Sequence, residues 1–245
     1  MARTPRPAAQ PDGTRPPAAR RRSHGGRITA AAIGVAGVAA LGVGLNHTSR
    51  PSASKVCAIA SVDAMQSQPL LTSWTAPGTN ACKPMQTKAG LTLPDPRCTP
   101  GAVNPTLTIT VLKNKDFSTG PCVRDKDTSA DAKNVTYSWY GIPRPPGNVG
   151  QKQVCEKDHL ISLELGGADS LANIWPQCGP DQNALNERYF KRKDLVENYL
   201  AAQVRSGAID LASAQHGIAS DWTQYIDKAA EWYKSGAAVT DNDEG

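Results

Sequence analysis

All six cysteines of this chain follow one long apolar segment, and this order limits the folds that the chain can adopt. Residues 28–45 contain no charged residue and no proline, and a membrane-spanning helix needs about 17–25 apolar residues. Arg20, Arg21, Arg22 and Arg27 precede the segment, and arginines beside a span stay in the cytoplasm. We therefore expect residues 28–45 to act as an uncleaved membrane anchor or a cleaved signal peptide, and the residues after them to be exported.

The cysteine spacing indicates disulfides rather than metal binding. No two cysteines form the C-x2-C pair that is typical of zinc sites, and an even number of cysteines on the exported side of a membrane favours disulfides. We expect neighbours in the sequence to pair, above all Cys155 with Cys178, because these two flank the segment that carries the candidate site. The six are Cys57, Cys82, Cys98, Cys122, Cys155 and Cys178.

The positive charge of the chain lies almost entirely near its N-terminus. The formal net charge is +5, but residues 1–27 hold seven arginines and one aspartate, a net +6. The other 20 basic and 21 acidic residues leave a net −1 for residues 28–245. A protein that holds duplex DNA chiefly through phosphate charge would carry a basic field over its folded part. This distribution argues against a transcription factor or an architectural DNA-binding protein.

Composition divides the chain into five parts. We expect a basic disordered tail or leader at 1–27, the apolar segment at 28–45, a linker with an irregular cysteine-containing appendage at 46–96, one folded domain at 97–235 and a disordered tail at 236–245. The hydrophobic fraction of 39% allows a core in part of the chain rather than across all of it.

Within the folded part, the pattern predicts two strands and then helices. Residues 106–112 alternate threonine with aliphatic residues, and residues 135–140 are rich in β-branched and aromatic residues, so both predict strands. Further along, apolar residues recur at helical spacing until Gly207, which ends the predicted helix, and Asp210 is placed to cap another one. The apolar face of the first helix consists of Val196, Tyr199, Leu200 and Val204.

Residues 155–178 hold the side chains best suited to catalysis. Asp158 and His159 are adjacent; in a regular strand they would point to opposite faces, and at a bend both can reach one site. Gly166 and Gly167 predict a tight turn, and Asn173 begins a return strand. The predicted order is strand, glycine-containing loop, strand and helix, with a carboxylate and an imidazole on the first strand and an amide at the second.

The stretch DHLISLELGG (158–167) followed by NIWPQ (173–177) resembles the HNH nuclease family, whose fold is a ββα-metal finger. The stretches RCTPGAVNP (97–105), KDLVENYLAAQV (193–204) and AQHGIASDW (214–222) extend the resemblance to a group of exported bacterial HNH-type proteins. The resemblance implies an α+β fold: a ββα-metal (HNH) finger with added short strands and C-terminal helices, stapled by disulfides. It also implies an endonuclease that hydrolyses phosphodiester bonds of DNA, with RNA as a further candidate substrate, at low sequence specificity.

The resemblance also implies roles for individual residues. His159 matches the general base, and an imidazole with a pKa of about 6.5 suits that role. Asp158 matches the carboxylate that holds a divalent metal, and Asn173 matches the residue that fixes the loop and helps to orient the histidine. Oxygen ligands of this kind favour Mg²⁺ or Mn²⁺ over zinc. For the last metal ligand, expected at the helix start, the candidates are Asn183 and, preferred over it, Asn186 and Glu187.

Two further interpretations stay open at this point. Lys191, Arg192 and Lys193 either contact phosphates or form an exposed helix face. The whole protein is either the nuclease or a non-catalytic exported envelope protein that keeps a degenerate HNH scaffold for interaction. A zinc-stabilised regulatory module is disfavoured by the cysteine spacing. Loss of activity in EDTA and in His159→Ala would separate the nuclease from the interaction protein.

Overall fold

The computed structural model describes residue 57 and residues 62–236, all within the structural unit Ser49–Gly245. In this part of the chain no helix is both long enough and apolar enough to span a membrane. The predicted N-terminal tail and the predicted anchor or signal peptide at 28–45 lie outside the described residues, as does all but one residue of the predicted C-terminal tail.

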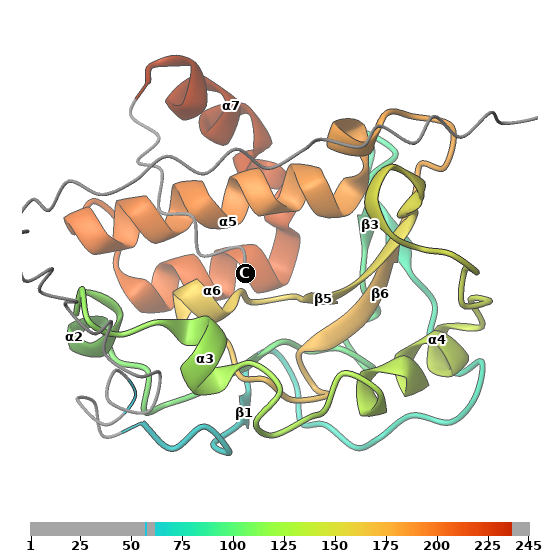
Figure 1. The fold of residues 1–245 in the computed structure, drawn as a ribbon, viewed down its shortest axis with the longest axis horizontal. Coiled ribbons are helices and arrows are strands. Elements are labelled where there is room, and N and C mark those ends of the chain that lie inside the picture. Colours follow the sequence, from blue (N-terminus) through green and yellow to red (C-terminus); the bar gives the residue numbers. More distant parts are fainter. Residues whose placement is uncertain (1–56, 58–61, 237–245) are drawn as a thin grey trace, which may run out of the picture. The chain divides into compact units, whose positions relative to one another are not determined.

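An antiparallel hairpin and the long helix that follows it organise the fold (Figure 1). The strand β5 (Cys155–His159) pairs with β6 (Ile174–Cys178), in a register that places Cys155 opposite Cys178. The helix α5 (Tyr189–Ser206) packs against both strands. The predicted order of strand, loop, strand and helix is therefore confirmed.

The loop between the two strands turns tightly because of its glycines. It contains the 3-10 helix η3 (Leu163–Leu165), which ends at Gly166 in the left-handed conformation (φ 75°) that glycine adopts most easily. At Gly167, a Cβ atom would collide with the carbonyl oxygen of Ile161. The predicted turn at the double glycine is confirmed, and its second glycine is required by the close approach of two backbone segments.

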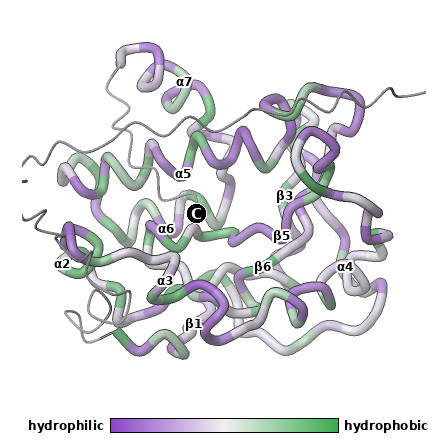
Figure 2. Tube along the Cα trace, viewed as in Figure 1, coloured by the Kyte–Doolittle hydropathy of each residue, from purple (hydrophilic) through white to green (hydrophobic). Residues whose placement is uncertain are grey.

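The C-terminal helices follow the sequence prediction closely. Gly207 ends α5 in the left-handed conformation (φ 84°), and Asp210 caps the next helix by accepting a hydrogen bond from the Ser213 N–H at 2.8 Å. Figure 2 shows hydrophilic and hydrophobic residues alternating along α5, as expected for a helix with one buried face. The segments after α5 are α6 (Leu211–Asp221), the 3-10 helix η5 (Trp222–Tyr225) and α7 (Ile226–Lys234).

Both strands predicted upstream of the hairpin are wrong. Part of segment 106–112 forms α2 (Ile109–Leu112), because the Thr108 hydroxyl accepts a hydrogen bond from the third helical N–H and caps a helix. Segment 135–140 forms α4 (Val135–Tyr140), which buries most of its side chains, including Trp139. Tertiary packing of these β-branched and aromatic residues therefore outweighs their preference for strands.

The other elements are short, and the fold as a whole mixes helices with small sheets. β1 pairs with β4, and β2 pairs with β3, each in an antiparallel two-stranded sheet. The bounds are β1 (Gln68–Pro69), β2 (Met85–Gln86), β3 (Thr92–Leu93), β4 (Ala102–Val103), α3 (Thr119–Val123), and the 3-10 helices η1 (Ala132–Asn134), η2 (Gly150–Lys152) and η4 (Leu185–Glu187).

Three disulfides lie within this unit. Cys82–Cys98 and Cys155–Cys178 join neighbouring cysteines as expected, whereas Cys57–Cys122 joins two cysteines that are not neighbours and lie 65 residues apart. Cys82 and Leu91 belong to the same buried core as Trp175 and Val196, so the segment before residue 97 contributes to the main core. The three disulfides indicate an oxidising, extracellular type of environment.

Candidate functional site

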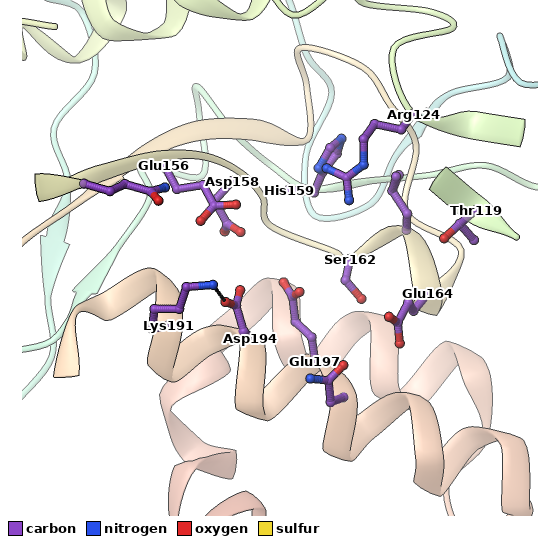
Figure 3. Close-up of a pocket in the computed structure, with 13 residues that line it drawn as sticks. Thr119, Arg124, Glu156, Asp158, His159, Ser162, Glu164, Lys191, Asp194 and Glu197 are labelled. Carbon is purple, nitrogen blue, oxygen red and sulfur yellow. Dashed lines mark hydrogen bonds and ion pairs between the residues drawn. The ribbon is translucent and has the colours of Figure 1, made fainter. Parts of the chain in front are cut away.

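A cavity of about 340 Å³ lies between β5 with its following loop and the helix α5 (Figure 3). Along β5, Glu156, Asp158 and His159 face Asp194 and Glu197 of α5 across this cavity. Because strand and helix both contribute acidic side chains, the cavity has a polar lining. Its other lining residues include Thr119, Arg124, Ser162, Glu164, Lys191 and Asn198.

His159 is held by a chain of charged side chains, which we call the histidine network: His159, Asp169, Lys133 and Asp125. Nε2 of His159 lies 2.8 Å from Oδ1 of Asp169, and Nζ of Lys133 donates to the same oxygen at 2.6 Å. Lys133 also donates to Asp125 at 2.7 Å, whereas Asp169 itself has no exposed surface. With Nε2 engaged, Nδ1 is the ring nitrogen that remains for the cavity.

Burial keeps the imidazole of this network neutral. It lowers the pKa of His159, and Lys133 and Arg124 act in the same direction, although Asp169 opposes them. Burial alone would raise the pKa of Asp169, but the hydrogen bonds from His159 and Lys133 outweigh it and lower that pKa. A neutral imidazole that donates its Nε2–H to a carboxylate carries its lone pair on Nδ1, where it can accept a proton.

A second buried lysine links β5 to α5 in what we call the carboxylate network: Lys193, Asp158 and Glu197. Nζ of Lys193 lies 2.9 Å from Oδ2 of Asp158 and 2.7 Å from the carbonyl oxygen of His159, and it also contacts Oε1 of Glu197. The Lys193 side chain is fully buried. The indole Nε1 of Trp175 donates to the same Asp158 oxygen at 3.1 Å.

Carboxylates crowd the cavity around this network. Burial raises the pKa of Glu156 to about 7, and the neighbouring charges of Asp194 and Asp158 add to the effect. Burial also raises the pKa of Glu197, although Lys193 opposes it. Repulsion between closely placed carboxylates and their loss of water both favour a cation in such a cavity.

Two further side chains give the cavity donors for an anionic ligand. Ser162 is 5% exposed, and its hydroxyl has no hydrogen-bond partner among the residues that the structure describes. Arg124 lines the cavity from the end of α3, and Figure 3 shows it beside His159. A hydroxyl and a guanidinium are both suited to phosphate oxygens.

Asn173 lies outside the cavity and fixes the loop that carries Asp169. Its fully buried amide donates to the carbonyls of Ile161 and Ala168 at 2.8 and 2.9 Å. The amide oxygen accepts from the N–H groups of Ile161 and Ala102 at 2.9 and 3.2 Å. One side chain therefore ties both ends of the loop to the edge of β4.

The preferred candidates for the last metal ligand do not reach the cavity. Asn186 and Glu187 belong to η4 and are exposed, and neither they nor Asn183 line it. Turns and η4 occupy the chain between β6 and Tyr189, so the helix that faces Asp158 begins later than the sequence suggested. Its acidic residues in the cavity are Asp194 and Glu197.

The predicted phosphate-binding residues divide into two environments. Lys191 lines the cavity and forms an ion pair with Asp194 at 2.8 Å. Lys193 does not lie on an exposed face, because its ammonium is held inside the carboxylate network. It could reach a phosphate only by leaving three oxygen partners, so the expected role for Lys193 does not fit its surroundings.

Three members of the histidine network, Asp169, Lys133 and Asp125, were absent from the sequence prediction. Asp169 follows the double glycine closely and lies ten residues after His159. A carboxylate so near the candidate base in the sequence could have been predicted as its hydrogen-bond partner. Lys133 lies 36 residues before Asp169, and no spacing rule connects them.

Within the described residues, no three His, Cys, Asp or Glu side chains form a group that could hold a metal ion by themselves. Asp158 and Glu197 instead share the ammonium of Lys193. No protein-family model matches the chain, and no curated protein or solved structure matches it.

Proposed function

We propose that this chain is an HNH-type endonuclease that hydrolyses phosphodiester bonds of DNA in a metal-dependent reaction. The observation that carries the proposal is a buried imidazole that meets a carboxylate through Nε2 and borders a cavity rich in carboxylates. The strand, loop, strand and helix that supply these groups occur in the order of a ββα-metal finger. RNA is a further candidate substrate, because the cavity offers groups for a phosphodiester rather than for a particular base.

His159 is the general base in this proposal. Its Nδ1 accepts a proton from the attacking water, and Asp169 stabilises the imidazolium that forms through the Nε2–H. Lys133 donates to the same oxygen of Asp169 and holds that carboxylate in place. Because burial lowers the pKa of His159, the base is neutral near pH 7, and activity decreases as the pH falls through that pKa.

The oxygen donors of the carboxylate network fit Mg²⁺ or Mn²⁺. Asp158 and Glu197 would hold the ion, with Glu156 and Asp194 in the same cavity. The excess of carboxylates in the cavity supports this fit. When bound, such an ion stabilises negative charge on the phosphate and on the leaving oxygen.

Phosphate contacts fall to Arg124 and Lys191, the basic side chains that line the cavity. A guanidinium can donate two parallel hydrogen bonds to phosphate oxygens. Since residues 28–245 carry a net charge of −1, binding depends on these local contacts, and sequence specificity is low. The disulfides support export, with residues 28–45 as membrane anchor or signal peptide.

The test uses the full-length oxidised protein with supercoiled plasmid in Mg²⁺, Mn²⁺ or EDTA. His159→Ala removes the proposed base, and His216→Ala is a matched control that alters an exposed histidine of α6. We expect the wild type and the control to nick DNA with metal and not in EDTA. We expect His159→Ala to be at least about 10²-fold slower, the usual contribution of a general base.

A non-catalytic exported interaction protein on a degenerate HNH scaffold is the second candidate. It is favoured by one observation: Lys193 already occupies the space between Asp158 and Glu197. Absence of cleavage in every metal, from protein with native circular dichroism and intact disulfides, would support this candidate and reject the nuclease.

A further inference from the structure

The fully buried Lys193 has a role that phosphate binding does not explain. We propose that its ammonium is a resident cation of the carboxylate network, which assembles Asp158 and Glu197 without a metal and weakens the binding of a divalent cation there. This inference rests on the proposed function, because it concerns the metal affinity of the same site.

The oxygen partners of Lys193 match the donors of its ammonium in number. An ammonium has three N–H donors, and Nζ has three oxygen partners: Oδ2 of Asp158, Oε1 of Glu197 and the carbonyl oxygen of His159. Each carboxylate therefore uses one oxygen for Lys193. The second oxygen of each, Oδ1 of Asp158 and Oε2 of Glu197, is left for the cavity that both side chains line.

Both carboxylates have supports that do not depend on Lys193. Asp158 lies on β5 and accepts from the indole of Trp175 at 3.1 Å. Glu197 lies within α5, which packs against β5 and β6. A neutral side chain at position 193 would thus remove the positive charge and leave the two carboxylates facing the same cavity.

Charge determines the direction of the expected effect. When all of its side chains are ionised, the network sums to −1 with Lys193 and to −2 without it. Charges in contact inside a protein interact far more strongly than charges in water. Two buried carboxylates without a counter-ion are also unfavourable, and a divalent cation relieves that repulsion. Removing the ammonium should therefore tighten metal binding.

Lys191 provides the matched control on the same helix. It pairs with Asp194 at 2.8 Å, but its side chain is 31% exposed, whereas that of Lys193 is fully buried. Solvent and salt screen an exposed charge much more than a buried one. Removing the charge of Lys191 should therefore change metal affinity far less.

The experiment titrates the full-length oxidised protein with Mn²⁺ and measures free Mn²⁺ by electron paramagnetic resonance. We expect the Kd of Lys193→Met to be at least about tenfold lower than that of the wild type, and that of Lys191→Met to change by less than about threefold. Thermal unfolding gives a second measurement, in which Mn²⁺ should raise the Tm of Lys193→Met more than that of the wild type.

Equal or weaker Mn²⁺ binding by folded Lys193→Met would overturn the proposal. Folding of this variant only in the presence of Mn²⁺ would support it. If the variant folds under neither condition, Glu197→Gln decides: it keeps Lys193 paired with Asp158, and Mn²⁺ binding should weaken by at least about tenfold. An unchanged Kd in Glu197→Gln would reject the inference.

Metal binding and nuclease activity are measured separately, so the two proposals can fail separately. Cleavage that needs His159, with the same Mn²⁺ affinity in wild type and Lys193→Met, rejects the role of Lys193 and keeps the nuclease. The expected affinities without cleavage reject the nuclease and keep the resident cation.

Discussion

The histidine network and the carboxylate network are built from similar parts, yet they leave different groups for the cavity. Asp158 and His159 are consecutive on β5, so their side chains leave the strand in different directions. Each meets a buried lysine: Lys133 reaches His159 through Asp169, and Lys193 contacts Asp158 directly. The first network leaves an imidazole nitrogen, and the second leaves carboxylate oxygens.

The difference lies in where the two carboxylate partners of each lysine are placed. Lys133 and the imidazole both bind one oxygen of Asp169, so the only fully buried carboxylate of that network is held by two donors. Lys193 is shared between two carboxylates that both line the cavity, so one negative charge remains there. A buried lysine can therefore either fix a base or set the charge of a cation site, depending on whether its carboxylate partners hold the imidazole or line the cavity.

The largest effect is expected from Asp169→Asn, which breaks the histidine network at its centre. The amide oxygen can still accept from Lys133 and from Nε2 of His159, but a neutral amide no longer stabilises the imidazolium that forms when His159 takes a proton. Nicking should slow by about 10²–10⁴-fold, as for other aspartates that orient a histidine. An unchanged nicking rate in a folded variant would show that Asp169 does not orient the base.

Lys133→Met separates the two networks by their response to metal. It leaves Asp169 buried with one donor fewer, which should cost about 3–5 kcal/mol in the free energy of unfolding. Mn²⁺ should not restore this loss, because Asp169 does not line the cavity. Urea unfolding with and without Mn²⁺ measures the difference. Equal rescue of Lys133→Met and Lys193→Met by Mn²⁺ would mean that the networks do not differ as described.

The pH dependence of stability sharpens the comparison on the carboxylate side. Burial and nearby carboxylates raise the pKa of Glu156 to about 7. A carboxyl group whose pKa is higher in the folded state stabilises the fold at low pH, and this contribution is lost as the pH rises through about 7. In EDTA, the Tm of the wild type should fall by a few degrees between about pH 5 and pH 8, and Glu156→Gln should flatten this fall. Calorimetry across this pH range is the measurement, and an identical slope in both proteins would contradict the prediction.

The smallest effect is expected at the outer end of the histidine network. Asp125 pairs with Lys133 at 2.7 Å, but its side chain is 47% exposed. Asp125→Asn should lower the free energy of unfolding by less than about 1 kcal/mol, as for other exposed ion pairs, and leave nicking unchanged. If Asp125→Asn lowered the free energy of unfolding as much as Lys133→Met does, Asp125 would be an essential partner of Lys133 and this prediction would be wrong.

Local sequence patterns correctly predicted those elements that are set by turn residues, helix caps and helical spacing. The order around β5, β6 and α5, the end of α5 at Gly207 and the cap at Asp210 all follow from turn and cap chemistry. The strand predictions at 106–112 and 135–140 failed because propensity says nothing about the tertiary neighbours that bury these side chains. The Cys57–Cys122 disulfide could not be predicted from the sequence, because only the fold brings these two segments together.

The sequence predicted the strand residues of the candidate site but not its helix residues. Asp158 and His159 could be chosen because chemistry and turn signals coincide in one short segment. The helix residues were placed too early, although Lys193 stands three residues before Val196 and seven before Leu200, on the buried stripe of α5. A lysine on an apolar stripe requires an acidic partner, and the sequence prediction did not use this signal for Lys193.

The two closed ends of the β5–β6 hairpin have a consequence for hydrogen exchange. Cys155–Cys178 joins one end covalently, and the amide of Asn173 holds the other through four backbone hydrogen bonds. Strand ends usually fray, so their amide protons exchange with solvent through local opening. Both ends of this hairpin are held against such opening. We therefore expect its amide protons, including those of Asp158 and His159, to be among the slowest to exchange within the described residues.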